Sequence, residues 1–385
     1  MALWLNFEGT LAAAAPFVPV NDAEVVATLP SRVGPQAQAD RQRRAQLQRQ
    51  PTDLPLALQT ARAAIERARQ SGDPRELGEA QAALAPWWTA ADAPPPARLL
   101  RAIVRQSQHD FDGALRDLDT LAAGPAPTPL PLRAQALLSR GAVLQLQGRF
   151  ASALQDCQAL QQPPLSQLGA AVVFAGQVCS AELAGLQGRA RAAQSLLARL
   201  AEQAPPDEAG WLTLVRAELA DRLGDATAGT RFREAAEQRG DIYSLAALAD
   251  WLLAARRPQE VITLLKGRED ADALLLRLAI AYRAAGDARS ADAVRMLQER
   301  FDALRQRGDT THAREEARFW LVLKNDPARA LTLAQTNWHH QKEPADARLL
   351  MRAAQAAGQP AAAEPVRRFM RETGYTDVRL AEASP

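Results

Sequence analysis

Two stretches of the chain repeat almost the same pattern, "HDFDGALRDLDTL" at residues 109–121 and "GRFASALQDCQAL" at residues 148–160. Each begins with a polar turn, continues with an aromatic and then a small residue, and goes on with apolar positions at helical spacing. Turn signals such as "LGDA" at 223–226 and "AGDA" at 285–288 recur at intervals of mostly about 30–40 residues, a period that predicts an array of helical hairpins.

The composition favours helices throughout. Hydrophobic residues make up 47% of the 385 residues, but aromatic residues make up only 5%, because Ala and Leu dominate the apolar content. Ala, Leu, Arg, Glu and Gln are good helix formers, which predicts an all-α chain. The length exceeds that of a usual single globular core, as a repeat array allows.

The unit at residues 135–160, "QALLSRGAVLQLQGRFASALQDCQAL", shows how one hairpin is built. Gly141 lies among the apolar residues of the first helix, and we expect it to let a neighbouring helix approach closely. Gly148 ends that helix, and Phe150 and Ala153 begin the apolar face of the second. Two such helices cannot bury both apolar faces alone, so each hairpin must stack on the next.

These four positions resemble the signature of the tetratricopeptide repeat. The resemblance implies a right-handed α-solenoid whose first helices line a concave face, which we expect to span residues 51–375. Other units match less well, since His109 stands where the turn glycine belongs and Ala226 where the aromatic residue belongs. The stretches "SGDPRELGEAQAAL", "RGDTTHAREEARFW" and "NWHHQKEPADARLL" are also similar to a group of uncharacterised bacterial proteins built on this repeat, a similarity that implies no reaction.

The two ends of the chain differ from the middle. Residues 1–15 end in an Ala-x-Ala pattern typical of a signal cleavage site, but lack a basic start, so they are either a signal-peptide remnant or an ordinary structured segment. Residues 16–50 are rich in proline and polar residues at their start, which predicts an extended N-terminal strap. We expect residues 376–385 to form a flexible tail.

Cys157 and Cys179 are the only cysteines. Each lies nine residues from a turn glycine, Gly148 and Gly188 respectively, so both are about 13 Å from the same end of the array. A disulfide between neighbouring helices and two free buried thiols both fit these positions. A disulfide indicates an oxidising compartment, so we expect a periplasmic or otherwise exported protein, with a cytoplasmic location as the alternative.

The sequence predicts no catalytic motif, cofactor site or metal site. It contains no P-loop, nucleophile elbow, dinucleotide-binding glycine pattern or HExxH. His312, His339 and His340 are the histidines that could bind a metal in principle. The adjacent His339 and His340 point to different helix faces, and no second ligand lies at helical spacing from this pair, because Glu343 follows in a loop that ends at a proline. The net charge of +2 comes from interleaved acids and arginines, so we expect no nucleic-acid partner, and no window is apolar enough for a membrane span.

Five residues are candidates for a peptide-binding groove. Trp211 and Tyr243 each stand thirteen residues before a predicted turn. Glu218 and Asp250 each stand six residues before it, and Asp221 follows Glu218 by three residues. Aromatic and acidic side chains at matched heights predict a stripe that suits an extended or helical peptide with basic residues. The alternative is that the aromatic residues pack between hairpins and the acids pair with Arg216 or Arg283.

The predicted function is therefore non-catalytic: a scaffold or adaptor that binds another protein or a peptide, which is basic if the acidic stripe is its site. A regulatory or sensor module that docks onto a membrane or an enzyme complex through its N-terminal strap is the alternative. A hydrolase with an unrecognised pocket and an RNA-binding helical repeat are the remaining hypotheses. The acidic stripe disfavours RNA.

Overall fold

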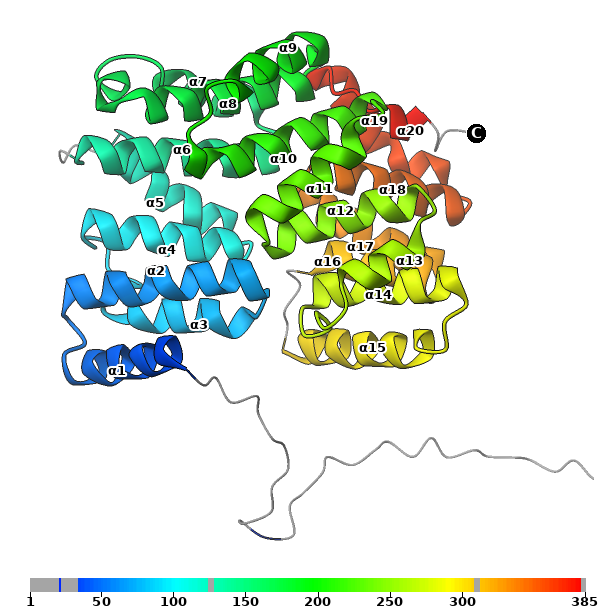
Figure 1. The fold of residues 1–385 in the computed structure, drawn as a ribbon, viewed down its shortest axis with the longest axis horizontal. Coiled ribbons are helices and arrows are strands. Elements are labelled where there is room, and N and C mark those ends of the chain that lie inside the picture. The colour runs from blue at the N-terminus through cyan, green and yellow to red at the C-terminus, as the bar shows by residue number, and fades with distance from the viewer. Residues whose placement is uncertain (1–20, 22–33, 124–127, 308–311, 382–385) are drawn as a thin grey trace, which may run out of the picture.

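The computed structural model describes residues 21, 34–123, 128–307 and 312–381. These residues form α-helices with short 3-10 turns, and no strand occurs among them. Nine helical hairpins follow one another through this part of the chain (Figure 1). The prediction of an all-α solenoid of stacked hairpins is confirmed. No helix in the described ranges is long and apolar enough to cross a membrane.

Each hairpin pairs an even-numbered first helix with the odd-numbered helix that follows it. The first helices are α2 Leu54–Ser71, α4 Pro95–Ser107, α6 Leu130–Leu146, α8 Ala170–Leu186, α10 Pro206–Leu223, α12 Ile242–Ala254, α14 Asp272–Ala285, α16 Ala313–Val322 and α18 Pro344–Ala356. The second helices are α3 Pro74–Ala83, α5 Phe111–Ala123, α7 Phe150–Ala159, α9 Ala190–Ala201, α11 Ala228–Arg239, α13 Pro258–Leu264, α15 Ser290–Gln306, α17 Pro327–His340 and α19 Glu364–Thr373.

Two predictions about the ends are wrong in part. The predicted extended strap becomes a helix, α1 Pro35–Arg49, before it reaches residue 50, because the sequence from residue 35 onward is rich in Gln, Ala and Arg. The predicted flexible tail begins with a short helix, α20 Val378–Ala381, in which Leu380 is buried. The predicted signal-peptide remnant and the rest of the strap, except for residue 21, lie outside the described residues.

The turns have the backbone geometry that their sequences predict. Gly148 has a φ of 74°, in the left-handed region where glycine has no steric cost. His109 occupies the equivalent turn position with a φ of 60°. A non-glycine residue tolerates this region at some cost, so the hairpin turn keeps its shape where the glycine is missing.

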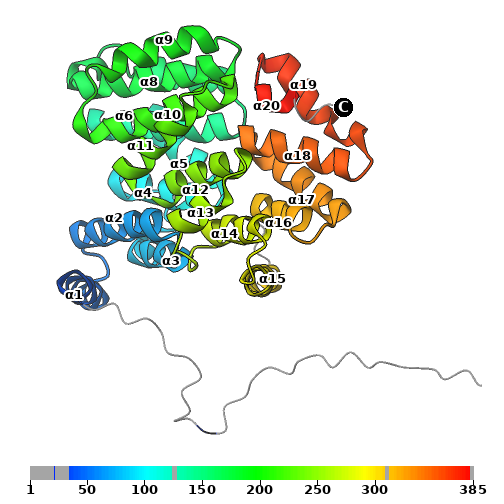
Figure 2. The ribbon, with the colours of Figure 1, turned by 45° about the vertical axis from the view of Figure 1, so that its right-hand side comes forward.

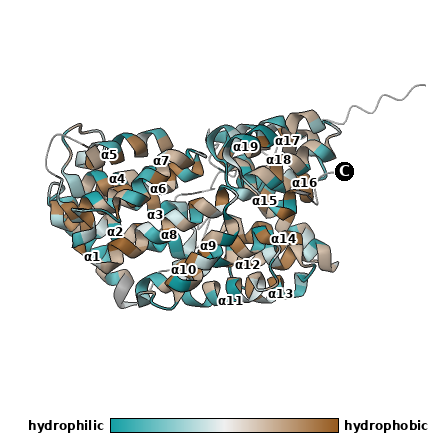
Figure 3. Ribbon diagram, turned by 90° about the horizontal axis from the view of Figure 1, so that it is seen from above, coloured by the Kyte–Doolittle hydropathy of each residue, from teal (hydrophilic) through white to brown (hydrophobic). Residues whose placement is uncertain are grey.

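The array curves until segments far apart in the sequence meet. In Figure 1 the chain rises from α1 to α9, descends from α10 to α15, and rises again through α16 to α20. Figure 2, turned by 45°, shows the same path, and Figure 3, from above, shows α4–α7 and α16–α19 on opposite sides. Helix α12 packs against α2, and α20 packs against both α10 and α18. The first helices therefore face a shared interior.

The C-terminal hairpin closes this curve by contacting the turns of earlier hairpins. The backbone N–H of Lys342 donates a 2.7 Å hydrogen bond to the carbonyl oxygen of Leu146. Beyond it, Phe369, Gly374 and Val378 lie against three successive turn glycines, Gly148, Gly188 and Gly224 respectively. The same glycines that end the first helices therefore also receive the C-terminal segment.

A disulfide joins two neighbouring hairpins. Cys157 on α7 and Cys179 on α8 are bonded, with their Cα atoms 5.6 Å apart. Close helix approach at this point depends on Gly176, where an added Cβ would lie 2.7 Å from the carbonyl oxygen of Cys157. The expectation that Gly141 serves this purpose is wrong, because a Cβ there would make only ordinary contacts of 3.7 Å or more.

Candidate functional site

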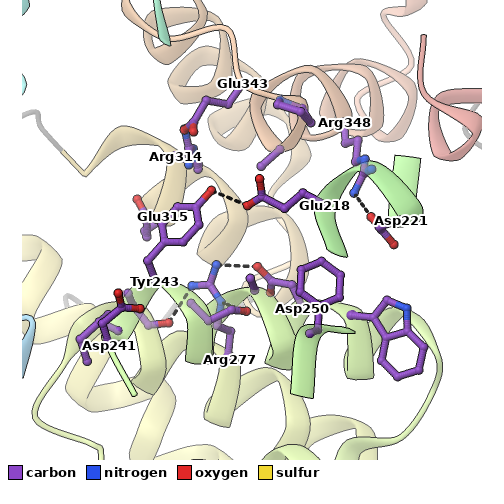
Figure 4. Close-up of a pocket in the computed structure, with 18 of the residues that line it drawn as sticks. Glu218, Asp221, Asp241, Tyr243, Asp250, Arg277, Arg314, Glu315, Glu343 and Arg348 are labelled. Carbon is purple, nitrogen blue, oxygen red and sulfur yellow. Dashed lines mark hydrogen bonds and ion pairs between the residues drawn. The ribbon is translucent and has the colours of Figure 1, made fainter. Parts of the chain in front are cut away.

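A cavity of about 680 Å³ lies at the centre of the curve. Most of its wall comes from the first helices α8 to α18, and Figure 4 shows part of this lining. The ends of α2, α4 and α6, the second helices α7 and α11, and the short helix α20 complete it. Charged side chains are prominent in this lining: Arg69, Glu182, Glu218, Asp221, Arg222, Arg239, Asp241, Asp250, Arg277, Arg314, Glu315, Lys342, Glu343, Arg348 and Arg379. A cavity of this size holds a small molecule or a few side chains of a larger partner.

Asp221 on α10 is fully paired within the chain. One carboxylate oxygen accepts a 3.0 Å hydrogen bond from Arg348 on α18, and the other accepts bonds of 2.9 and 2.6 Å from Arg379 on α20. Arg348 also donates a 2.7 Å hydrogen bond to Asp377. This network joins the middle of the array to its C-terminal end and stabilises the closed curve.

Asp250 on α12 is also paired. It accepts hydrogen bonds of 2.6 Å from Arg277 on α14 and 2.5 Å from Arg318 on α16. Burial opposes ionisation of this carboxyl, but the two guanidinium groups outweigh it and lower the pKa of Asp250. The carboxylate is therefore ionised, and its charge is already compensated by the chain's own arginines.

Glu218 on α10 differs, because it faces the cavity and forms no ion pair with any residue that the structure describes. The hydroxyl of Tyr243 donates a 2.8 Å hydrogen bond to it, and Figure 4 shows the two side chains pointing toward each other. Burial and the nearby charge of Glu182 raise the pKa of Glu218 to about 7. Tyr243 is 52% exposed, the most exposed large hydrophobic side chain among the described residues, and that exposure opens into the cavity.

Glu182 on α8 extends this acidic wall. It accepts a 2.5 Å hydrogen bond from the side-chain amide of Gln145. Burial raises the pKa of Glu182, and no ion pair with an arginine or lysine of the described residues compensates its charge. Glu182 and Glu218 are therefore two neighbouring carboxyl groups that form no ion pair within the described part of the chain.

Arg222, one turn beyond Glu218 on α10, lines the same cavity. Its side chain is buried, with 6% of the residue exposed, and its Nε has no hydrogen-bond partner among the described residues. Its charge acts on both Glu182 and Glu218, yet it forms an ion pair with neither. Arg222 thus carries a charge that the described part of the chain does not pair.

Four of the five sequence-predicted groove residues come together at the cavity: Glu218, Asp221, Tyr243 and Asp250. The placement of Trp211 is wrong, because it packs against the apolar cluster between α8, α9 and α10 and does not line the cavity, as the alternative of packing between hairpins predicts. The alternative that the acids are paired within the chain holds for Asp221 and Asp250, though with other arginines than Arg216 and Arg283.

Sequence reasoning missed Glu182, Arg222 and Arg314. Arg314 pairs with Glu343 at the start of α18 and, at 2.5 Å, with Asp346. Glu182 stands six residues before the turn glycine Gly188, the same spacing that singled out Glu218 and Asp250. That signal could have found Glu182, whereas Arg222 and Arg314 have no counterpart at matching positions in the neighbouring units.

The histidines do not assemble a metal site. His109 lines the cavity and stacks on Phe111 with ring centroids 5.5 Å apart, and burial lowers its pKa. The residues that the structure describes contain no group of three or more His, Cys, Asp or Glu side chains arranged to hold a metal ion.

The fold and the cavity define a helical-repeat protein with tetratricopeptide-like architecture. No protein-family model and no curated protein matches the chain. Among solved structures it is similar to the crystal structure of the APC/C hetero-tetramer Cut9-Hcn1, with 13% identity and a TM-score of 0.40 over 88% of this chain and 73% of that one. It is also similar to the P58(IPK) TPR domain, with 16% identity and a TM-score of 0.20 over 78% of this chain and 98% of that one.

Proposed function

We propose that this chain is a non-catalytic binding protein that holds a segment of a partner polypeptide, with a basic side chain of that segment inside the cavity. The observation that carries the proposal is the contrast among the cavity acids. Asp221 and Asp250 are paired with arginines, whereas Glu218 forms no ion pair among the described residues and accepts a hydrogen bond from the hydroxyl of Tyr243. Burying a carboxylate without an ion-pair partner is unfavourable, so a cationic group of the ligand would supply the positive charge that pairs with Glu218.

The dimensions of the cavity support this mode of binding. A volume of about 680 Å³ admits a few side chains but not a whole helix or a folded domain. The partner therefore stays mostly outside and inserts one part of its chain. Tyr243 offers an aromatic face beside the acid, an arrangement that favours a guanidinium or ammonium group.

The test is the binding of short, terminally capped peptides that differ in one central residue, Arg, Lys, Gln or Glu, measured by fluorescence polarisation. We expect the Arg and Lys peptides to bind the full-length protein, and the Glu218→Gln variant to bind them about tenfold more weakly, since a charge-assisted hydrogen bond is lost. Glu299→Gln is the matched control, because Glu299 is an exposed acid on α15, away from the cavity. Equal binding of all four peptides, or no binding, contradicts the proposal.

The disulfide between Cys157 and Cys179 supports an exported location as part of this proposal, because such bonds persist in oxidising compartments. Mass spectrometry of the mature N-terminus from the native organism is the test. Cleavage near residue 15 supports export. An intact N-terminus with both thiols reduced in the cell contradicts it.

A further inference from the structure

Three cationic side chains of the cavity wall, Arg69, Arg222 and Lys342, form no ion pair among the described residues, and of these only Arg222 is buried. Arg222 is 6% exposed, and its Nε is buried without a hydrogen-bond partner among the described residues. Each of its cavity neighbours Arg277, Arg314 and Arg348 contacts at least one carboxylate. A buried guanidinium without an anion is unfavourable, so the position of Arg222 indicates a group that comes from outside.

The acids closest to Arg222 in electrostatic terms are unpaired as well. Glu182 and Glu218 both interact with its charge, but no ion pair forms. The guanidinium lies close to α8, since a Cβ added at Gly185 would lie 3.3 Å from a terminal nitrogen of Arg222. The wall therefore presents two carboxyl groups and one guanidinium that face the same space and stay separate.

Separated opposite charges on one wall complement a ligand that carries both signs. A purely cationic ligand satisfies Glu182 and Glu218 but leaves Arg222 buried and unpaired. A purely anionic ligand satisfies Arg222 but adds repulsion from two acids. A ligand with a cation at one end and a carboxylate at the other satisfies all three groups and adds no net charge to the cavity.

We propose that this wall binds an arginine or lysine residue with a free α-carboxylate, its cationic side chain between Glu182 and Glu218 and its carboxylate on Arg222. The inference rests on the proposed function for the basic side chain and adds the carboxylate. Arginine fits better than lysine, because its planar guanidinium can contact two carboxyl groups and stack on the exposed ring of Tyr243. The C-terminal residue of a partner chain supplies these two charges alone, and the free amino acid supplies them together with an additional α-ammonium group.

Isothermal titration calorimetry of the full-length protein tests the carboxylate directly. The probes are L-arginine, L-argininamide, which lacks the carboxylate, and N-acetylarginine, which keeps it. Two short peptides complete the set, one ending in a free Arg carboxylate and one with the same residues but a C-terminal amide. We expect each free carboxylate to bind about tenfold more tightly than its amide, the effect of one charge-assisted hydrogen bond.

Two variants of Arg222 test whether its guanidinium binds the carboxylate of the ligand. Arg222→Met removes the guanidinium and keeps most of the buried volume, so it should bind L-arginine and L-argininamide equally and weakly. Arg222→Lys should restore part of the preference for the carboxylate, which a merely structural role of Arg222 does not explain. Circular dichroism and thermal unfolding of each variant show whether it is folded, and the comparison of probes on the unaltered protein stands without any variant.

The outcomes separate this inference from the proposed function. If capped peptides with a central Arg bind but L-arginine and L-argininamide bind equally, the inference is overturned and the proposed function stands. If L-arginine binds and no peptide does, the inference holds for the free amino acid and the proposed function is overturned. If no probe binds, both are overturned.

Discussion

Glu218 is a carboxyl group that the fold keeps partly protonated near neutral pH. Burial and Glu182 raise its pKa from 4.5 to about 7. The unfolded chain loses this proton near its ordinary pKa, whereas the folded chain keeps it to higher pH. The stability that Glu218 contributes is therefore fully present at low pH and is lost as the pH rises through this window.

We predict that the Glu218→Gln substitution removes this loss. The difference in unfolding free energy between the variant and the unaltered protein should change in favour of the variant by roughly 1–3 kcal/mol as the pH rises from about 5 to about 8. Gln keeps an oxygen that can accept the hydrogen bond from Tyr243. Urea denaturation at the two pH values is the measurement, and a stability difference that does not change with pH contradicts the prediction.

The sequence predicted four of the cavity residues because their spacing from the turns is a local property. Positions at equal distances from equivalent turns lie at equal heights, which brought Glu218, Tyr243 and Asp250 together correctly. Height does not fix the direction of a side chain, and Trp211 at the same height points into the apolar cluster of α8 and α9 instead. The pairing of Asp221 with Arg379 spans 158 residues, a distance over which spacing carries no information.

At the scale of the element, the sequence predicted the hairpins well, because turn glycines and apolar periodicity act locally. The last hairpin shows this, since its second helix ends at Thr373, where Gly374 takes the left-handed conformation that glycine favours at a helix end. Helix α20 was missed because its stability comes from contacts with α10 and α18 rather than from its own four residues.

The disulfide ties the third hairpin to the fourth across a sequence separation of 22 residues. We predict that the double substitution Cys157→Ala and Cys179→Ala lowers the unfolding free energy by about 3 kcal/mol, mainly because the unfolded chain gains freedom. The measurement is chemical denaturation with and without a reductant. A reductant should destabilise the unaltered protein but not the double variant, and the same response from both proteins contradicts the prediction.

The contact between the C-terminal segment and Gly188 can be separated from the backbone cost of replacing a turn glycine. Gly188 and Gly286 have φ values of 78° and 67°, so Ala is strained at both. An added Cβ at Gly188 lies 3.0 Å from the carbonyl oxygen of Gly374, whereas one at Gly286 has nothing within 4 Å. Gly286→Ala is therefore a matched control for Gly188→Ala.

We predict that Gly188→Ala costs roughly 0.5–2 kcal/mol more than Gly286→Ala, because the C-terminal backbone must move away. Hydrogen exchange should also become faster in α19 and α20 for Gly188→Ala alone. If both variants lose the same stability and hydrogen exchange in α19 and α20 is unchanged, the close contact between Gly188 and Gly374 does not contribute to stability.

At the scale of the whole molecule, closure of the curve converts a concave face into a cavity. The sequence predicted an open groove, because a repeat pattern specifies how each hairpin packs on the next but not how small rotations add up over nine of them. Contacts such as that of Lys342 with Leu146 depend on the total rotation of the array, so they cannot be predicted from the repeat pattern of one unit. The same closure bears on Glu182 and Arg222, which line the cavity. On an open groove, water would solvate these charges and they would need no ligand.

Asp221 is the residue on which closure depends most directly, because it binds Arg348 and Arg379 from two C-terminal helices at once. We predict that Asp221→Asn lowers the unfolding free energy by roughly 2–4 kcal/mol, since two half-buried guanidinium groups lose a shared carboxylate. Hydrogen exchange should become faster in α18 to α20 and stay unchanged in α14 and α15, which lie away from this network.

The control is Asp292→Asn, which removes an exposed ion pair with Arg295 on α15, where both side chains are about two-thirds exposed. Its effect on stability should be near zero, because solvent screens such pairs. Small-angle X-ray scattering should show a larger radius of gyration for Asp221→Asn than for Asp292→Asn, since a weakened joint lets the two ends of the curve separate. If both variants keep the compact radius and the slow exchange of α18 to α20, the contacts of the C-terminal segment with Gly148, Gly188 and Gly224 are sufficient to hold the curve closed, and the cavity is a permanent feature of the fold.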